Sequence, residues 1–155
     1  MKMLSAFLLM LASTLVYAAD PEGFGLWKGG VVQNSGKDLA GKIDEQKFAW
    51  QPLATYDNHL MGISHREGDG MAELHETQAD IMVVESGAAT LVVGGTMVAP
   101  KTVKPHEVRA TSIEGGEIKQ LAAGDVVHIP AKVPHQLKIA PGTEFTYLVI
   151  KVDAK

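Results

Sequence analysis

The sequence of 155 residues contains no cysteine. This absence excludes disulfide bonds, thiol nucleophiles, iron–sulfur clusters and zinc sites built on cysteine. Basic residues are also scarce, because 14 lysines and arginines stand against 18 acidic residues and leave a net charge of −4. A nucleic-acid-binding protein needs a basic surface to meet the phosphate backbone, so we expect no DNA or RNA partner.

Several short catalytic motifs are missing as well. The sequence has no Gly-x-Ser-x-Gly elbow, no P-loop, no dinucleotide fingerprint and no His-Glu-x-x-His helix, the signatures of four large enzyme classes. Its length is that of one domain and excludes large multidomain enzymes.

An apolar run at the N-terminus predicts an export signal. Lys2 supplies a positive start, residues 4–16 are apolar or small, and Ala18 and Ala19 offer a cleavage site. A membrane-spanning helix needs about 20 apolar residues to cross roughly 30 Å of hydrocarbon, so this run is too short for an anchor. We predict that residues 1–19 are a cleavable signal helix and that the mature chain is secreted or periplasmic, with no membrane association after cleavage.

The residue composition of the remaining chain changes near residue 57. Residues 20–57 carry turn signals at Gly29-Gly30 and around Asn34, and we expect an N-terminal extension with little regular structure, in which residues 38–50 could form one short helix. Residues 58–155 consist of short β-rich runs separated by glycine, proline and aspartate. Strands at such spacing predict an all-β single domain, an antiparallel sandwich or barrel.

The individual strands can be placed from these breaks. A long loop is expected over residues 96–106, because Pro100 and Pro105 cannot donate hydrogen bonds to a sheet. The predicted strands cover residues 59–67, 72–77, 80–85, 89–93, 107–112, 117–121, 125–130, 135–139 and 144–152.

Polar residues on apolar strand faces are the candidate ligands. Side chains two apart on a strand share a face, so His135 lies with Leu137, and Glu73 lies with His75. Asp80 opens the next strand. Burying two carboxylates without a cation costs several kcal/mol, and two imidazoles with carboxylate oxygens form the ligand set of non-haem iron or manganese sites. The alternative is a salt-bridged rim on which Glu73 and Asp80 face water.

Two motifs around these residues resemble those of the cupin family. The first cupin motif runs Gly, five residues, His-x-His, three or four residues, Glu, six residues, Gly. Here Glu73-x-His75, four residues, Asp80, six residues and Gly87 keep that spacing, while the opening glycine is displaced to Gly68. Glu73 stands in the place of the first histidine and Asp80 in the place of the glutamate.

The second cupin motif runs Gly, five residues, Pro-x-Gly, two residues, His, three residues, Asn. Gly124, Pro130 and His135 match it, with Lys132 replacing the middle glycine and Ile139 the final asparagine. The resemblance covers roughly residues 62–152 and implies a cupin-like β-barrel or jelly roll over residues 58–155.

The resemblance also implies a ligand set for one mononuclear metal ion inside the barrel: Glu73, His75, Asp80 and His135. Iron or manganese is favoured, with zinc, nickel or copper as alternatives, because Glu73 in place of a histidine shifts the site toward metals that prefer oxygen. Glu73 could instead be catalytic, as a general base beside the metal.

Two further residues are candidates for substrate contact. His65 shares a strand face with Met61 and Ile63 and could line the same cavity, and Gln78 lies next to the first motif. We expect a small-molecule ligand, and a metal-dependent enzyme of the oxygenase, isomerase or lyase type acting on a small acid or sugar. The alternative is a non-catalytic module that binds a metal or small ligand. The resemblance implies a homodimer, and uncovered edge strands of a small sandwich favour one too.

Overall fold

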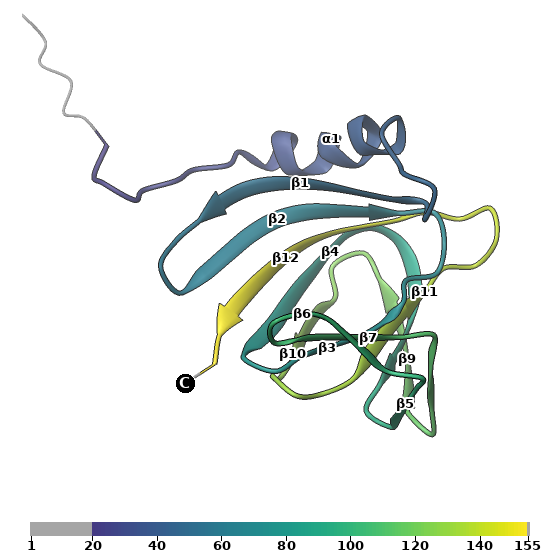
Figure 1. The fold of residues 1–155 in the computed structure, drawn as a ribbon. Coiled ribbons are helices and arrows are strands. Elements are labelled where there is room, and N and C mark those ends of the chain that lie inside the picture. Colours follow the sequence, from purple (N-terminus) through teal and green to yellow (C-terminus); the bar gives the residue numbers. More distant parts are fainter. Residues whose placement is uncertain (1–19, 155) are drawn as a thin grey trace, which may run out of the picture.

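The computed structural model describes residues 20–154, so the predicted signal helix over residues 1–19 lies outside the described residues. Within residues 20–154 the chain forms one helix and twelve strands (Figure 1). Their bounds are α1 Gly29–Ala40, β1 Phe48–Thr55, β2 His59–Arg66, β3 Ala72–His75, β4 Gln78–Val93, β5 Thr96–Val98, β6 Lys101–Lys104, β7 Glu107–Ala110, β8 Ser112–Glu114, β9 Glu117–Ala122, β10 Val126–Ile129, β11 His135–Lys138 and β12 Phe145–Asp153.

Two antiparallel sheets curl around a shared strand, β4. Its first half pairs with β10 and β12, and the sheet continues through β2 to β1. Its second half pairs with β9 and β11, and this sheet continues through β3 and β7 to β6. Figure 1 shows the two sheets as opposed layers of one curled half-barrel, with the β5–β8 pair at one end. The prediction of an all-β, antiparallel, cupin-like barrel is confirmed.

The change of sheet along β4 depends on a glycine. Gly87 has φ of +78°, and a Cβ at this position would collide with the carbonyl oxygen of Glu144. The pairing of β4 with β12 also shifts its register between Thr146 and Tyr147, next to this point. The last glycine of the first motif is therefore needed where β4 bends from one sheet into the other.

The main core fills the space between the two sheets. It is formed by alternate, inward-facing residues, as expected for packed antiparallel sheets. Met82 and Val84 of β4 lie beside their cross-strand neighbours Val149 and Tyr147 of β12 in this cluster, which also includes Leu137 of β11. The same inward faces carry the polar residues described below.

The N-terminal segment differs from the prediction. Instead of little regular structure, residues 20–57 contain α1 and β1, and the helix lies at Gly29–Ala40 rather than within residues 38–50. The turn signals were misleading because α1 packs on the outer face of β1 and β2 (Figure 1), where Leu39 joins Ala49 and Ile63 in a second apolar cluster. Gly36 brings the helix close to β12, since a Cβ there would lie 2.8 Å from the Thr146 hydroxyl oxygen.

Two strand predictions also need correction. The expected loop over residues 96–106 contains the short strands β5 and β6, and residues 80–85 and 89–93 belong to one continuous strand, β4. Pairing with β7 and β8 holds the two short strands in spite of the prolines that flank them. No helix in residues 20–154 has the length and apolar character needed to cross a membrane.

Candidate metal centre

Cross-strand pairing brings the four predicted metal ligands together. On β3, Glu73 is paired with His135 of β11 on one side and with Arg109 of β7 on the other. His75, two residues further along β3, is paired with Glu107 of β7. Residues directly opposite each other on neighbouring strands have side chains in contact, so the site is a consequence of strand register.

Three of these residues form a compact donor group. Glu73, His75 and His135 each offer one ligand atom, and these atoms all lie within 4.8 Å of one another. The two imidazole ring centroids are 5.4 Å apart. Asp80 Oδ2 lies 3.4 Å from His75 Nε2 and 3.6 Å from His135 Nε2. Two imidazoles and nearby carboxylate oxygens are compatible with a divalent metal ion.

Outer hydrogen bonds fix both imidazole rings. His75 Nδ1 lies 3.0 Å from Glu107 Oε2, and His135 Nδ1 lies 3.1 Å from the backbone carbonyl oxygen of Val133. Each acceptor requires a proton on Nδ1, so each Nε2 is the atom turned toward the shared space. This is the arrangement by which carboxylates and carbonyls orient metal-binding histidines.

Lys151 enters the same space and was missed by the sequence analysis. Its Nζ lies 2.8 Å from both carboxylate oxygens of Asp80, which is its direct cross-strand neighbour, and 2.8 Å from His75 Nε2. Two nitrogens at 2.8 Å form a hydrogen bond only if one of them offers a lone pair. Lys151 therefore neutralises Asp80 and competes with any cation for His75.

Arg109 binds one of the two carboxylate oxygens of Glu73 and leaves the other free. Its Nη1 donates to Glu73 Oε1 at 3.0 Å, and its Nη2 donates to Glu107 Oε1 at 2.6 Å. The other oxygen, Glu73 Oε2, lies 3.6 Å from His75 Nε2. One oxygen of Glu73 is thus held by an arginine while the second faces the histidines.

The electrostatics of the site centre on His75. Burial lowers its pKa, but hydrogen bonds with Asp80 and Glu107 outweigh this effect and the repulsion of Lys151, so the pKa rises to about 9. For Asp80 burial raises the pKa, and the histidines and Lys151 reverse this and hold it well below its usual range. For Glu107 burial also raises the pKa, and contacts with His75 and Arg109 bring it down to about 2. Without a metal, hydrogen bonds from His75 to Glu107 and from Lys151 to Asp80 balance the buried carboxylates.

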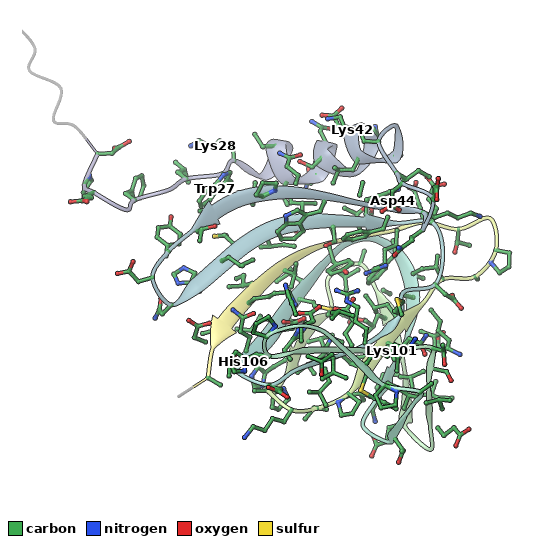
Figure 2. All side chains as sticks on the ribbon, in the orientation of Figure 1. Trp27, Lys28, Lys42, Asp44, Lys101 and His106 are labelled. Carbon is green, nitrogen blue, oxygen red and sulfur yellow. The ribbon has the colours of Figure 1, made fainter. Side chains whose placement is uncertain are left out.

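A cavity of about 360 Å³ opens from this group between the two sheets. Figure 2 shows side chains from both sheets filling the space around it, with Lys28 and Lys42 beside α1 and Lys101 and His106 on the opposite side of the molecule. Its charged lining comprises Arg66, Lys104, Arg109, Lys151, Glu73 and Asp80. Its apolar lining comprises Phe48, Trp50, Leu60, Met71, Met82, Leu137 and Val149.

The two predicted substrate contacts do not line this cavity. His65 is fully buried, and its Nδ1 lies 2.8 Å from Thr146 Oγ1. It occupies the face of β2 opposite to Arg66, which does line the cavity, because adjacent residues of a strand point to opposite faces. Gln78 donates instead to Asp153 Oδ1 at the end of β12, 2.9 Å away.

The missed residues did leave a signal in the sequence. Lys151 follows Tyr147 and Val149 at spacings of two, so it lies on the buried face of β12, and all three line the cavity. Arg66 follows Ser64 in the same way on β2. A charged residue on the apolar face of β2 or β12 therefore indicates a cavity-lining side chain, as His135 does in β11.

Comparisons with known proteins agree with this architecture. No protein-family model matches the chain, and no curated protein matches it significantly. A solved cupin protein from Bacteroides fragilis aligns over 72% of this chain and 80% of its own, with a TM-score of 0.50 and 18% identity. The chain has a cupin fold. KdgF from Halomonas sp. aligns over 72% and 84% of the two chains (TM-score 0.51, 16% identity), and the polyketide cyclase RemF from Streptomyces resistomycificus over 69% and 66% (0.50, 17%).

The chain departs from the cupin motif pattern at a turn that supports the site. Lys132, in the place of the motif glycine, has φ of +67°, a conformation that costs a residue with a side chain about 1 kcal/mol. Its backbone N–H donates to the carbonyl oxygen of His75 at 2.7 Å. The turn between β10 and β11 therefore fixes the backbone of one candidate ligand while leading into the strand of the other.

Proposed function

We propose that this cupin binds one divalent metal ion through His75, His135 and Glu73 and is a metal-dependent enzyme acting on a small acid or sugar. The observation that carries the proposal is the orientation of the two imidazoles, whose Nδ1 atoms are engaged by Glu107 and the Val133 carbonyl. Both Nε2 atoms are therefore free to bind a metal, and the ligand atoms of Glu73, His75 and His135 lie within 4.8 Å of one another. Iron or manganese suits two imidazoles and a carboxylate best, and zinc, nickel or copper are alternatives.

The residues would divide the work as follows. The ion would supply Lewis acidity or an oxygen-activating centre with open positions for a ligand. Glu73 Oε2 is the oxygen free for the metal, because Arg109 engages Oε1. Asp80 becomes a fourth ligand only when Lys151 leaves it. Lys151 Nζ is then the group able to deliver or accept a proton at the cavity wall, while the apolar lining excludes water.

An oxygenase, isomerase or lyase reaction fits such a centre, since a metal ion with open positions can orient a substrate and polarise its oxygen atoms. RemF, one of the similar structures, is a cyclase, so the fold accommodates catalysts. We assign Glu73 the role of ligand, with a general-base role as the alternative that the same contact with His75 permits.

One observation favours a second function, a non-catalytic binding module. The ammonium group of Lys151 lies between Asp80 and His75, in the space that a fourth-ligand metal site would use. A protein that keeps Lys151 there could capture small molecules without a metal and without turnover.

Metal analysis of the purified mature chain tests the proposal. We expect about one divalent ion per chain by mass spectrometry, loss of the ion in His75→Ala and in His135→Ala, and retention in His128→Ala, a matched control because His128 is exposed. Product formation by the wild type across a panel of small acids and sugars supports the enzyme. Metal binding without turnover supports the binding module, and a metal-free wild type that folds normally overturns the metal proposal.

We also propose that the protein is exported and forms a homodimer. Support for export comes from the apolar N-terminal run alone. Support for a dimer comes from the edge strand β6, on which Val103 is exposed. N-terminal sequencing of the protein recovered outside the cytoplasm tests cleavage after Ala18 or Ala19, and light scattering on the mature chain tests the dimer.

A further inference from the structure

Two of the charged groups that line the cavity, Arg66 and Lys104, have no carboxylate oxygen within hydrogen-bond distance, and only Arg66 is enclosed, since the Lys104 side chain is 68% exposed. Arg109 is engaged by Glu73 and Glu107, and Lys151 by Asp80. Arg66, in contrast, donates one long hydrogen bond, from Nε to the Tyr147 hydroxyl at 3.4 Å. Its nearest carboxylate oxygen, Glu73 Oε1, lies 3.8 Å from Nη2, beyond hydrogen-bond distance. Among residues 20–154, Nη1 and Nη2 of Arg66 therefore have no acceptor.

This unpartnered guanidinium is almost completely enclosed. The Arg66 side chain is only 10% exposed, and the residue lines the cavity. Its nearest counter-charge is Glu73, at 3.8 Å, and leaving the terminal N–H groups of an enclosed guanidinium without a hydrogen-bond acceptor costs free energy. In the described residues, only one side-chain polar atom is both fully buried and without a hydrogen-bond partner, and it is Gln136 Oε1. The terminal nitrogens of Arg66, which also lack an acceptor, are therefore accessible to solvent. The two terminal nitrogens of Arg66 thus reach the open space of the cavity.

The guanidinium plane is also held in place. Its carbon Cζ lies 4.3 Å from the centre of the Phe48 ring, a distance at which cation and ring attract each other. On the Gly70 side, a Cβ would lie 3.2 Å from both Cζ and Nη1, so the missing side chain there leaves room for the group. An arginine fixed in this way presents a rigid pair of donors, which matches the two oxygens of a carboxylate.

The surroundings define the rest of the ligand. Four cationic and two anionic side chains line the cavity, and Glu107 beside Arg109 and Lys104 adds a third carboxylate, so one cationic group remains in excess and an anion is favoured over a neutral molecule. Beside Arg66 the walls are apolar, with Trp50, Leu60 and Met71 among them. Arg66 is also next to Glu73, one of the donor group around His75, so an anion held by Arg66 places its body against the candidate metal centre.

We propose that Arg66 is the carboxylate-binding residue of this cavity and that the ligand is a small monocarboxylic acid with an apolar, aromatic or branched aliphatic body. This inference names the ligand class of the proposed site and rests on that proposal only in taking the cavity as the ligand site. Neither a metal ion nor turnover is needed for it to be tested.

Binding of phenylacetate to the mature chain in EDTA, followed by ligand-observed NMR and calorimetry, provides the test. Phenylacetamide is the neutral probe of the same shape, and phenyl phosphate and inorganic phosphate are the competing anions. We expect phenylacetate to bind at least tenfold more tightly than phenylacetamide and more tightly than either phosphate. In Arg66→Met, phenylacetate and phenylacetamide should bind with about equal affinity. Lys138→Met removes one charge on the exposed side of β11 and should change the affinity less than twofold.

A conservative variant keeps the test decisive if Arg66→Met fails to fold. Arg66→Lys retains the charge but not the fork, and should lose most of the preference for the acid. Equal binding of acid and amide by the wild type, or no binding of any acid, overturns the inference without any variant. Tighter binding of the phosphates overturns the carboxylate assignment. Because all measurements are made in EDTA, a failure here is distinct from a failure of the metal analysis, and either result can occur alone.

Discussion

Raising the pH from 6.5 to 9 should destabilise the metal-free protein through one buried side chain, His75. Its pKa in the folded protein is raised from 6.5 to about 9, because hydrogen bonds with Asp80 and Glu107 outweigh burial, which acts in the opposite direction. A group whose folded-state pKa is raised binds its proton more tightly when folded, so its contribution to stability is complete below pH 6.5 and is lost as the pH rises toward 9. Each pKa unit corresponds to about 1.4 kcal/mol, so the loss is about 3 kcal/mol.

Urea unfolding in EDTA at pH 6, 7, 8 and 9 measures this effect directly. We expect the difference in unfolding free energy between wild type and His75→Gln to shrink by up to about 3 kcal/mol across this range. His128→Gln, which changes an exposed histidine, should run parallel to the wild type. Parallel profiles for wild type and His75→Gln would refute the reasoning. They would mean that His75 stays neutral at pH 6 and accepts a hydrogen bond at Nε2 from the Lys151 ammonium group.

Three further variants test the site and its supports. Lys151→Met should raise the affinity for Mn²⁺ or Zn²⁺ by about tenfold or more, because it removes a cation that competes for Asp80. Competition with a fluorescent chelator measures the metal affinity, and a weaker affinity in the variant would contradict the prediction. Gly87→Ala should lower the unfolding free energy by more than about 2 kcal/mol. Gly142→Ala, where φ is similar but nothing lies within 4 Å of the added Cβ, should lower it by only about 1 kcal/mol. Equal urea midpoints for the two variants would contradict this prediction. Lys132→Gly should change the melting temperature by no more than a few degrees, since relief of its positive φ offsets the added freedom of the unfolded chain, and a large fall would show that its side chain is needed.

Local alternation was enough to predict most strands after residue 57 and the inward position of His135. His135 and Leu137 share a face in the sequence, and both line the cavity. Spacing located Gly87 as the last glycine of the first motif, and its φ is positive, although a break between two strands was predicted where β4 continues through a bend. These features depend on a few consecutive residues, and the sequence displays them directly.

The N-terminal segment could not be predicted in the same way. Glycines and Asn34 lower the helix propensity of residues 29–40, yet α1 forms there because Leu39 and Val32 pack on the sheet. Its partners belong to β1, β2 and β12, and the closest approach joins Gly36 to Thr146, far apart in the chain. Tertiary packing of this kind leaves little trace in local propensity.

The charge pairs of the site depend on register between distant strands. Lys151 and Asp80 are 71 residues apart and become direct neighbours only through the pairing of β12 with β4. A shift of one residue would turn Lys151 to the other face of its strand. The sequence therefore indicates that Lys151 lies on the inward face of its strand, since it follows Tyr147 and Val149, but not which carboxylate it contacts.

The charge of the cavity lining argues for an acid rather than a sugar as the ligand. Four cationic side chains and two carboxylates already line the cavity without a metal. A divalent ion on His75 and His135 would add two positive charges in a partly enclosed space, where charges are poorly screened. A carboxylate beside Arg66 would compensate part of this excess, whereas a neutral sugar would compensate none. Binding free energies are coupled reciprocally, so a metal that strengthens the binding of an acid must itself be held more tightly when the acid is present, and the proposed metal-binding and carboxylate-binding groups would then act as one site.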